Sequence, residues 1–151
     1  MKKKFAGYIN LKPLNGIIYP SSIQNILMKN FIENNLGGIF YLSPTEVLQA
    51  KFSVTLETLI SKETKVSGIV MLSTFLLPKS FKERKSMYKK LLTSKKKMYF
   101  IFDELALESK KDIRKIENFI IFNDKHFINT KKKLNTYENL IIKKYRDVSF
   151  V

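Results

Sequence analysis

The feature of the sequence that most constrains its fold is the alternation of short apolar runs with segments in which apolar residues recur at helical spacing. Four such runs are predicted to be strands: 5–9, 38–42, 68–72 and 98–102. Almost uniformly apolar strands are typical of a sheet that helices cover on both faces, and their alternation with helices indicates βαβ units. The sequence therefore predicts an α/β fold, a doubly wound three-layer sandwich. Its four-stranded, mostly parallel sheet is expected in the order 2-1-3-4, with the first and third strands adjacent at the centre.

The first two helices are predicted from a cap, a stop signal and apolar spacing. Ser21 or Ser22 can cap the first helix, and Gly37-Gly38 would end it. Its inward face is expected to consist of four apolar residues: Ile23, Ile26, Leu27 and Phe31. A short second helix before the third strand is predicted from apolar residues at helical spacing: Phe52, Leu56, Leu59 and Ile60.

Two pairs of residues with the spacing of a capping box predict the later helices. Ser80 and Glu83 open a helix whose inward residues would be Met87, Tyr88, Leu91 and Leu92. Ser109 and Asp112 open another, expected to pack on the sheet through residues that follow at spacings of three and four: Ile113, Ile116 and Ile120. The segment 118–122 could instead be a fifth strand, because its β-branched and aromatic residues do not separate a strand from a buried helix end.

The length of 151 residues is usual for one domain. We expect this domain over residues 1–125 and a lysine-rich tail or arm over 126–151, which could contain a short helix at 137–145. The aromatic residues of 119–122, together with Phe127, exceed what the surface of a small monomer usually carries. They predict self-association, hypothetically as a homodimer.

The residue types present exclude several kinds of site. Because the chain has no cysteine and His126 is its only histidine, thiolate chemistry and His-rich or Cys-ligated zinc sites are excluded, and only oxygen-ligated metals stay open. No metal site and no cofactor is predicted, since the G-x-G-x-x-G, Walker and G-x-S-x-G motifs are missing. No apolar run reaches the roughly 18–20 residues that cross a bilayer and no export signal is recognisable, so a cytoplasmic location is expected.

The formal net charge of +15 would ordinarily suggest a polyanion as partner. However, the only arginines are Arg84, Arg114 and Arg146, and the chain is rich in Lys, Asn, Ile and Phe, a profile typical of an AT-rich genome. Runs such as Lys95-Lys96-Lys97 are more often solvated turns than docking sites. Charge alone therefore leaves nucleic-acid binding open without predicting it.

Polar residues follow each predicted strand. Right-handed crossovers bring the carboxyl ends of parallel strands to one edge, where open α/β sheets bind ligands. The predicted ligand-binding residues at this edge are Asn10, Lys12, Gln24, Asn25, Glu46, Ser73, Thr74 and Asp103. Glu46 and Asp103 are the candidates for a general acid and base, and a sugar phosphate or nucleotide would suit the site. The same residue types are also ordinary in strand-to-helix turns, so each position has a structural alternative.

Several segments, in order and at suitable spacing, resemble one known family. They are Gly7-Tyr8, Pro13 with Gly16 and Tyr19-Pro20, Gln24-Asn25, Tyr41-Leu42-Ser43 with Glu46, Gly68-Ile69-Val70, Ser73-Thr74-Phe75 with Leu77-Pro78, Arg84 with Met87-Tyr88, Phe100 with Asp103, and Asp112 with Ile116-Glu117. Together they cover about residues 5–122 and are similar to the sporadic carbohydrate cluster proteins, found beside surface-polysaccharide genes. The resemblance implies a role in the biosynthesis of lipopolysaccharide, capsule or another surface carbohydrate, with a sugar or sugar nucleotide as ligand. It adds Phe75 to the predicted site and supports Gln24, Asn25, Glu46 and Ser73, whereas Lys12, Leu76 and Asp103 depart from the family pattern.

The order of elements also resembles, more distantly, the catalytic domain of serine recombinases, which implies a resolvase-like fold. In that family a nucleophilic serine follows the first strand and arginines follow the third. Here 7–12 contains no serine and 73–78 no arginine, although transesterification of DNA needs a nucleophile and guanidinium groups around the phosphate. The resemblance therefore implies a shared fold without shared catalysis.

Two hypotheses follow. The chain is either a carbohydrate-pathway protein, with enzymatic activity left open, or a non-catalytic binding or assembly module that could contact nucleic acid through its lysines. A continuous lysine face opposite the polar edge would favour the binding module, whereas scattered lysines around a compact polar cleft would favour the carbohydrate protein.

Overall fold

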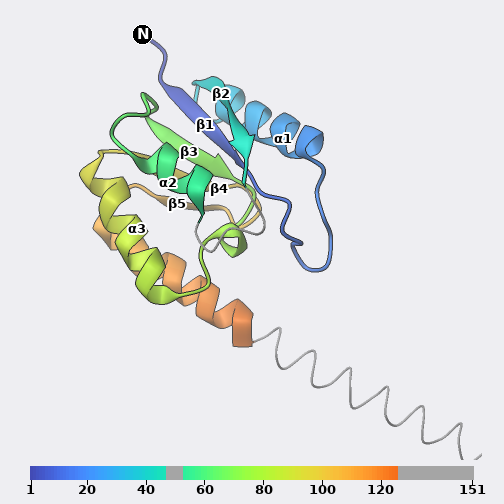
Figure 1. Ribbon diagram of the computed structural model, residues 1–151, viewed down its shortest axis with the longest axis vertical. Coiled ribbons are helices and arrows are strands. Elements are labelled where there is room, and N and C mark those ends of the chain that lie inside the picture. The colour runs from blue at the N-terminus through green and yellow to red at the C-terminus, as the bar shows by residue number, and fades with distance from the viewer. Residues whose placement is uncertain (47–52, 126–151) are drawn as a thin grey trace, which may run out of the picture. The chain divides into compact units, whose positions relative to one another are not determined.

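The computed structural model describes residues 1–46 and 53–125 (Figure 1). The chain divides into two compact units, Met1–Ile116 and Glu117–Val151, and the second is described only over 117–125. Phe52, Phe127 and the segment 137–145 lie outside the described residues. The expected division of the chain at residue 125 stays a prediction.

The sheet has five strands in the order β2-β1-β3-β4-β5. They are β1 (Lys4–Ile9), β2 (Ile39–Thr45), β3 (Gly68–Met71), β4 (Lys97–Phe100) and β5 (Leu105–Leu107). β1 pairs in parallel with β2 and β3, and β3 pairs in parallel with β4. The predicted order 2-1-3-4, with the first and third strands at the centre, is thus confirmed. The prediction missed β5, which pairs antiparallel with β4 and is too short to show a period of its own.

Burial follows the position of each strand in the sheet. All residues of β3 are buried, as is β1 from Phe5 onward. In contrast, the edge strand β2 is mostly exposed, including the apolar side chains of Ile39, Tyr41 and Leu42. The expectation that every strand is covered on both faces is wrong for β2, because a run of apolar residues does not reveal whether a strand has one neighbour or two.

Helices lie on both faces of the sheet. α1 (Ser21–Asn34) lies on one face, and α2 (Val54–Ile60) and α3 (Phe81–Thr93) lie on the other (Figure 1). Gly7 allows α1 to pack closely on β1, since a Cβ atom there would lie 3.0 Å from Cε of Met28. The two-sided covering predicted from the sequence is therefore present.

The inward face of α1 differs from the prediction. Its buried residues are Gln24, Met28 and Ile32, whereas Ile23 and Ile26 are exposed by 43% and 55%. Leu27 and Phe31 are half-buried. The apolar spacing predicted the wrong buried face of α1. Gln24 is turned inward, although it is polar, because its side chain donates hydrogen bonds to the carbonyls of Asn10 and Tyr19, which precede the helix. The N-cap is Pro20 rather than a serine, and no side chain caps this helix.

The later helices follow the predicted boundaries. Ser80 is the N-cap of α3, although its side chain makes no capping bond, and Met87, Tyr88 and Leu91 are buried as predicted, while Leu92 is half-buried. Residues 110–125 are helical, so the alternative of a strand at 118–122 is wrong. Oδ2 of Asp112 accepts hydrogen bonds from the backbone N of Ser109 at 2.8 Å and from its Oγ at 3.0 Å. This is the acidic half of the second capping box; the other half is absent, because the N of Asp112 donates to the Ser109 carbonyl and not to its hydroxyl.

Candidate functional site

The predicted site residues lie at the carboxyl edge of the sheet, where hydrogen bonds join all but Asn25 into two groups. The backbone N of Lys12, in the second group, donates to Oδ1 of Asn10, in the first, at 2.9 Å. In the first group, Nδ2 of Asn10 donates to the Tyr8 hydroxyl at 3.0 Å, and this hydroxyl donates to Oε2 of Glu46 at 3.0 Å. Nε2 of Gln24 donates to the Asn10 carbonyl at 2.9 Å. All four residues are buried, so this group forms the inner wall of the edge rather than a surface open to a ligand.

Glu46 also closes the start of α2. Its two carboxylate oxygens accept the backbone N–H groups of Thr55 and Leu56, each at 3.1 Å. The N-cap residue Ser53 makes no side-chain capping bond, so the carboxylate that follows β2 replaces the usual local cap. Burial raises the pKa of the Tyr8 hydroxyl well above its ordinary value, and the adjacent carboxylate raises this pKa further, so the hydroxyl stays a donor to Glu46.

The second group joins the loops after β1, β3 and β4. Oγ of Ser73 donates to Asp103 at 3.0 Å, and the backbone N of Thr74 donates to the same carboxylate. Nζ of Lys12 donates to the carbonyl of Phe75 at 2.8 Å, in the 3-10 helix η1 (Thr74–Leu76). The predicted convergence of these loops is therefore seen in their hydrogen bonds.

Accessibility separates the predicted residues into two classes. Glu46 is only 6% exposed, and Asn10, Gln24, Ser73 and Thr74 are buried as well. The half-buried residues, which a ligand could reach, are Lys12, Asn25, Phe75 and Asp103. Among residues 1–46 and 53–125, no hydrogen bond joins Glu46 to Asp103 and no group of acidic or histidine side chains could hold a metal ion. The geometry gives Glu46 a structural role and does not present it as an acid or base.

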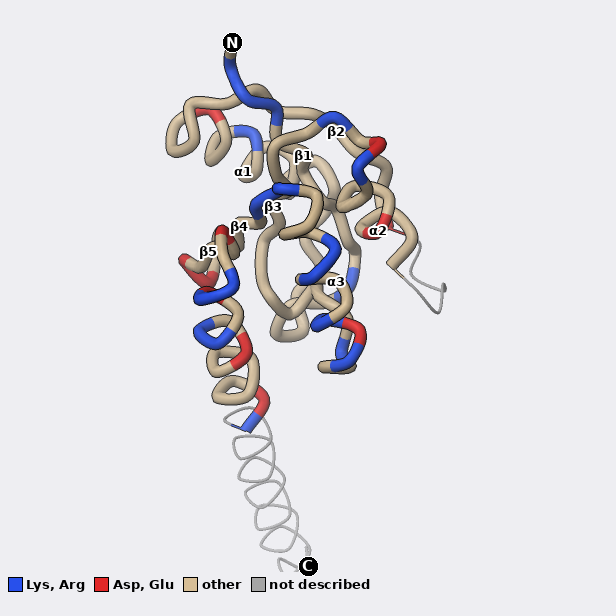
Figure 2. Tube along the Cα trace, turned by 90° about the vertical axis from the view of Figure 1, so that its left-hand side faces the viewer, with Lys and Arg blue, Asp and Glu red and all other residues tan. Residues whose placement is uncertain are grey.

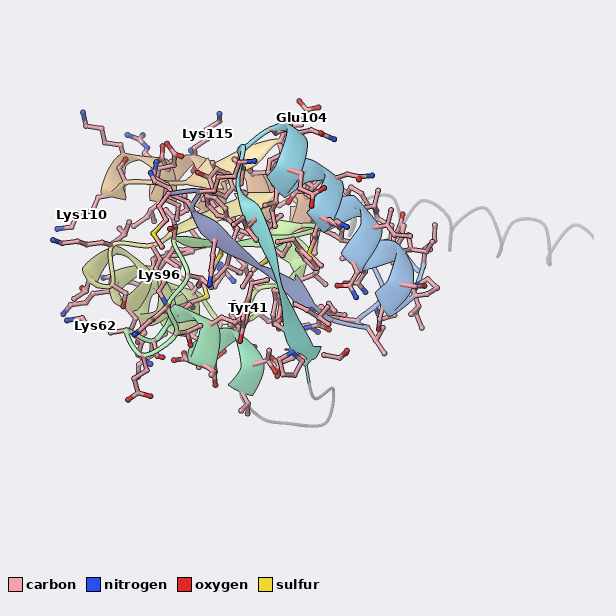
Figure 3. The ribbon with its side chains drawn as sticks, turned by 90° about the horizontal axis from the view of Figure 1, so that it is seen from above. Tyr41, Lys62, Lys96, Glu104, Lys110 and Lys115 are labelled. Atoms are coloured by element: carbon pink, nitrogen blue, oxygen red, sulfur yellow. The ribbon has the colours of Figure 1, made fainter. Side chains whose placement is uncertain are left out.

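Lysines gather at the opposite, amino edge of the sheet. They come from the amino ends of β1 and β4, from the segments that precede β1, β3 and β4, and from the residues that follow the antiparallel β5. We call this surface the basic rim: Lys2, Lys3, Lys4, Lys62, Lys65, Lys95, Lys96, Lys97, Lys110 and Lys111. In Figure 3, Lys62, Lys96 and Lys110 lie on the left side of the view.

Hydrogen bonds hold the segments of the basic rim together. The backbone N of Ser67 donates to the Lys4 carbonyl at 2.7 Å, and the backbone N of Lys97 donates to the Ser67 carbonyl at 3.2 Å. Nζ of Lys97 forms an ion pair with Glu108 at 3.0 Å, just after β5. Segments far apart in the sequence thus form one continuous edge.

Lys96 is the buried member of the basic rim, with 4% of its surface exposed. Its Nζ donates to the carbonyls of Leu59 at 2.7 Å, of Thr64 at 2.8 Å, and of Ser61. Burial lowers the pKa of this ammonium, and the carbonyl oxygens at the end of α2 stabilise its charge. Lys96 therefore anchors the loop before β3, while its neighbours in sequence face solvent.

Charge differs sharply between the two edges. The basic rim carries ten lysines against the carboxylates Glu63, Glu108 and Asp112, whereas charges are near balance at the carboxyl edge, where Glu46, Glu83, Asp103 and Glu104 face Lys12, Lys79, Lys82 and Arg84. A second basic surface lies along the exposed side of α3, where Lys82, Lys85 and Lys89 line one helix (Figure 2). The lysine excess is therefore concentrated on particular surfaces and is nearly absent from the polar edge.

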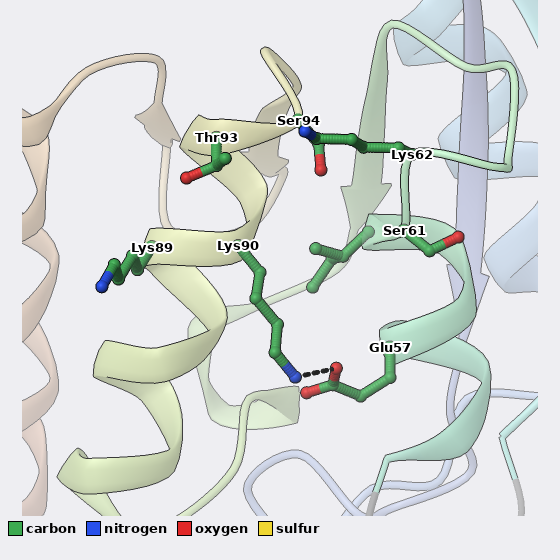
Figure 4. A pocket seen from close by; sticks show the side chains of 8 residues that line it. Glu57, Ser61, Lys62, Lys89, Lys90, Thr93 and Ser94 are labelled. Carbon is green, nitrogen blue, oxygen red and sulfur yellow. Dashed lines mark hydrogen bonds and ion pairs between the residues drawn. The ribbon is translucent and has the colours of Figure 1, made fainter.

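Lysines line two cavities formed by the described residues. One, of about 400 Å³, lies between α2 and α3 and is crossed by an ion pair of 2.7 Å between Lys90 and Glu57 (Figure 4). It adjoins the carboxyl ends of both helices, where lysines offset the negative end of each helix dipole, so a structural role accounts for it. The other, of about 420 Å³, lies in the basic rim and is lined by Lys3, Phe5, Leu36, Val66, Ser67, Lys95, Lys97 and Tyr99.

The basic rim does not emerge from runs such as Lys95-Lys96-Lys97 taken one at a time, which resemble solvated turns. The signal becomes visible only when the runs are compared. The topological argument that gathers the residues after each strand also gathers the residues before each strand at the other edge. Applied to Lys2-Lys3-Lys4 and Lys95-Lys96-Lys97, it would have placed both runs together.

No model of a known protein family matches the sequence, and no curated protein matches it. Within the described residues, no helix is long and apolar enough to cross a membrane. Among solved structures, the chain is similar to the crystal structure of the N-terminal catalytic domain of TP901-1 integrase. The two share 13% sequence identity and a TM-score of 0.52, over 82% of this chain and 96% of that chain. At this identity the similarity shows the fold alone, so the resemblance to sporadic carbohydrate cluster proteins stays a prediction. The chain has the α/β fold of a serine-recombinase catalytic domain.

Proposed function

We propose that the chain is a non-catalytic binding module on a serine-recombinase-like fold, and that its basic rim docks nucleic acid. The observation that carries the proposal is the segregation of charge between the two edges of the sheet. An AT-rich genome would raise the lysine content of every exposed surface. It would not concentrate lysines at the amino edge and leave the carboxyl edge with nearly balanced charges.

The extent of the basic rim favours a long polyanion over a small anion. A small anion needs donors that converge on one point, whereas these lysines are distributed along an edge built from several chain segments. Lysine ammonium groups act as point charges that bind phosphates without reading bases. The expected interaction is therefore sensitive to salt and largely independent of sequence.

The non-catalytic part of the proposal rests on the carboxyl edge. The segment 7–12, which leads out of β1, contains no serine that could act as the nucleophile of a recombinase, and 73–78 contains no arginine. Glu46 is engaged by Tyr8 and by the backbone of α2. These residues stabilise the loops around the strand ends, which supports a fold retained without recombinase chemistry.

The test compares two variants with equal loss of charge. The rim variant replaces Lys3, Lys65, Lys95 and Lys110 by Gln, and the matched control replaces Lys79, Lys82, Lys85 and Lys89 on and before α3. Fluorescence anisotropy with labelled oligonucleotides is measured over a range of salt concentrations. Each lost phosphate contact should reduce the magnitude of the slope of log K against log[salt] by roughly 0.7–0.9. This magnitude should therefore fall by about 3 in the rim variant and by much less in the control. Equal losses in the two variants, or no binding at low salt, would overturn the proposal.

One observation favours a second candidate function at the carboxyl edge. Oγ1 of Thr74 and Oδ1 of Asn25 are buried and have no hydrogen-bond partner among the described residues, and such atoms call for an explanation, of which a bound molecule beside the half-buried Asn25 is one. We propose, as this second candidate, a sugar phosphate or sugar nucleotide in the biosynthesis of a surface carbohydrate. UDP-glucose and glucose 1-phosphate should then raise the melting temperature of the wild type and not of Asp103→Asn, with Glu104→Gln as the control. No shift in the wild type would remove this candidate.

A further inference from the structure

We propose that the cavity in the basic rim takes an unpaired nucleobase, so that the nucleic acid bound there is single-stranded. This inference rests on the proposed function and specifies its ligand. The cavity, of about 420 Å³, opens between the amino ends of β1, β3 and β4. Its volume is within the range of pockets that enclose small organic ligands, about 300–1,000 Å³, which is ample for a base.

The wall of the cavity is aromatic and fixed in position. The ring of Tyr99 packs edge-on against Phe5, with ring centroids 6.0 Å apart, and lies 6.1 Å from Phe31. The Tyr99 hydroxyl donates to Glu108 at 2.7 Å, and Lys97 holds the same carboxylate at 3.0 Å. Tyr99 lines the cavity and is half-buried, so its ring is the surface on which we expect an inserted base to stack.

The mouth of the cavity supplies positive charge. Lys3 and Lys95 line it, and neither forms an ion pair within the described part of the chain. They would bind the phosphates on either side of an inserted base. The hydroxyl of Ser67, which also lines the cavity, offers a donor and an acceptor for the edge of the base.

This combination separates single strands from other polyanions. A base pair inside a duplex is stacked and cannot enter a cavity without unstacking, which costs a few kcal/mol. An anionic membrane would attract the lysines but would leave the aromatic wall unused, and inorganic phosphate would do the same. Only an unpaired nucleotide matches charge at the mouth and an aromatic wall inside.

The test uses three decamers of equal backbone charge per strand: dT10, the corresponding abasic strand, and a duplex. The wild type should bind dT10 at least about fivefold more tightly than the abasic strand, since stacking of one base contributes that much or more. It should also bind dT10 more tightly than the duplex. Equal affinity for dT10 and the abasic strand would overturn the inference, as would tighter binding to vesicles that contain anionic lipid than to dT10.

Two variants that fill the cavity without a change in charge sharpen the test. Leu36→Trp and Ser67→Phe should reduce the affinity for dT10 to that for the abasic strand and leave the salt dependence unchanged. Ile26→Trp, at an exposed position of α1, adds the same ring outside the cavity and should keep the preference for dT10. Retention of the preference in both filled variants would contradict the inference, and if neither variant folds, the comparison of decamers in the wild type decides.

The outcomes distinguish this inference from the proposed function. If the rim variant and the α3 control lose equal affinity, the docking surface itself is wrong. If the rim variant alone is weakened, but dT10 and the abasic strand bind equally, the rim binds nucleic acid and the cavity does not receive a base.

Discussion

The Tyr8 hydroxyl, on β1, donates a hydrogen bond of 3.0 Å to the Glu46 carboxylate, 38 residues further along the chain. The same carboxylate accepts the first free N–H groups of α2. One buried acid therefore ties the central strand to the helix that covers it. Glu46, whose residue type and position suggested acid-base chemistry, therefore stabilises the fold.

The first prediction follows from this contact. Glu46→Ala should lower the free energy of unfolding by about 2–3 kcal/mol, because it leaves the Tyr8 hydroxyl and the N–H groups of Thr55 and Leu56 buried without an acceptor. Glu46→Gln keeps one oxygen and should cost about 1 kcal/mol. Urea denaturation followed by circular dichroism measures both. The control is Glu57→Ala, which removes an exposed ion pair with Lys90 and should cost less than about 1 kcal/mol. A loss for Glu46→Ala no larger than this control would show that the cap is unimportant.

The sheet could be predicted because the alternation of short apolar runs with helical segments is a local sequence pattern, which can be recognised without knowledge of tertiary contacts. β1, β3 and β4 are short apolar runs between helical segments, and their parallel order follows from right-handed crossovers. β5 could not be found in this way. Its three residues, Leu105–Leu107, are defined by pairing with β4, which is a contact between segments and not a local pattern.

The candidate site was only partly predictable for a related reason. Topology correctly placed Lys12, Ser73 and Asp103 at one edge, since they follow strands. Whether a polar side chain there faces solvent or the core depends on its hydrogen-bond partners. Gln24 illustrates this dependence, because its bonds to the Asn10 and Tyr19 carbonyls draw a polar residue into the interior that an apolar pattern would have left outside.

The second prediction concerns the buried Lys96. Lys96→Met should lower the free energy of unfolding by about 1–3 kcal/mol, because the side chain keeps its length but leaves the carbonyls of Leu59, Ser61 and Thr64 without their donor. The neighbouring Lys95→Met changes an exposed lysine of the same loop and should cost less than about 0.5 kcal/mol. Thermal and urea denaturation of the two variants provide the comparison. Similar stabilities would contradict a structural role for the Lys96 ammonium.

The third prediction is a dependence of stability on pH at the start of the last helix. The backbone N–H of Glu108 holds the pKa of the Asp112 carboxyl below its ordinary value of 3.8, and the hydroxyl and N–H of Ser109 act in the same direction. A carboxyl whose pKa is lower in the folded state stabilises the fold above its unfolded pKa, and the contribution is lost as pH falls through the folded value.

Unfolding free energies between about pH 5 and about pH 3 should therefore decrease less in Asp112→Asn than in the wild type. Glu63→Gln changes an exposed carboxylate of the loop before β3 and should leave the profile as in the wild type. Parallel profiles for Asp112→Asn and the wild type would exclude Asp112 as a contributor.

The last prediction is self-association through the aromatic segment of the second unit. Within 117–125, Ile121 and Phe122 are 49% and 69% exposed, and an apolar surface of this kind commonly marks a contact between proteins. Two copies of a chain with a net charge of +15 repel each other, so association should increase with salt, in contrast to binding of nucleic acid, which weakens. Light scattering should give a mass above 17.7 kDa that rises with protein and salt concentration, and Phe122→Ser should reduce it. Ile26→Ser, which removes an apolar side chain that is 55% exposed on α1, should leave the mass unchanged. A monomer at high protein and salt concentration would refute the prediction. Equal effects of the two substitutions would show that the contact between copies does not lie in this segment.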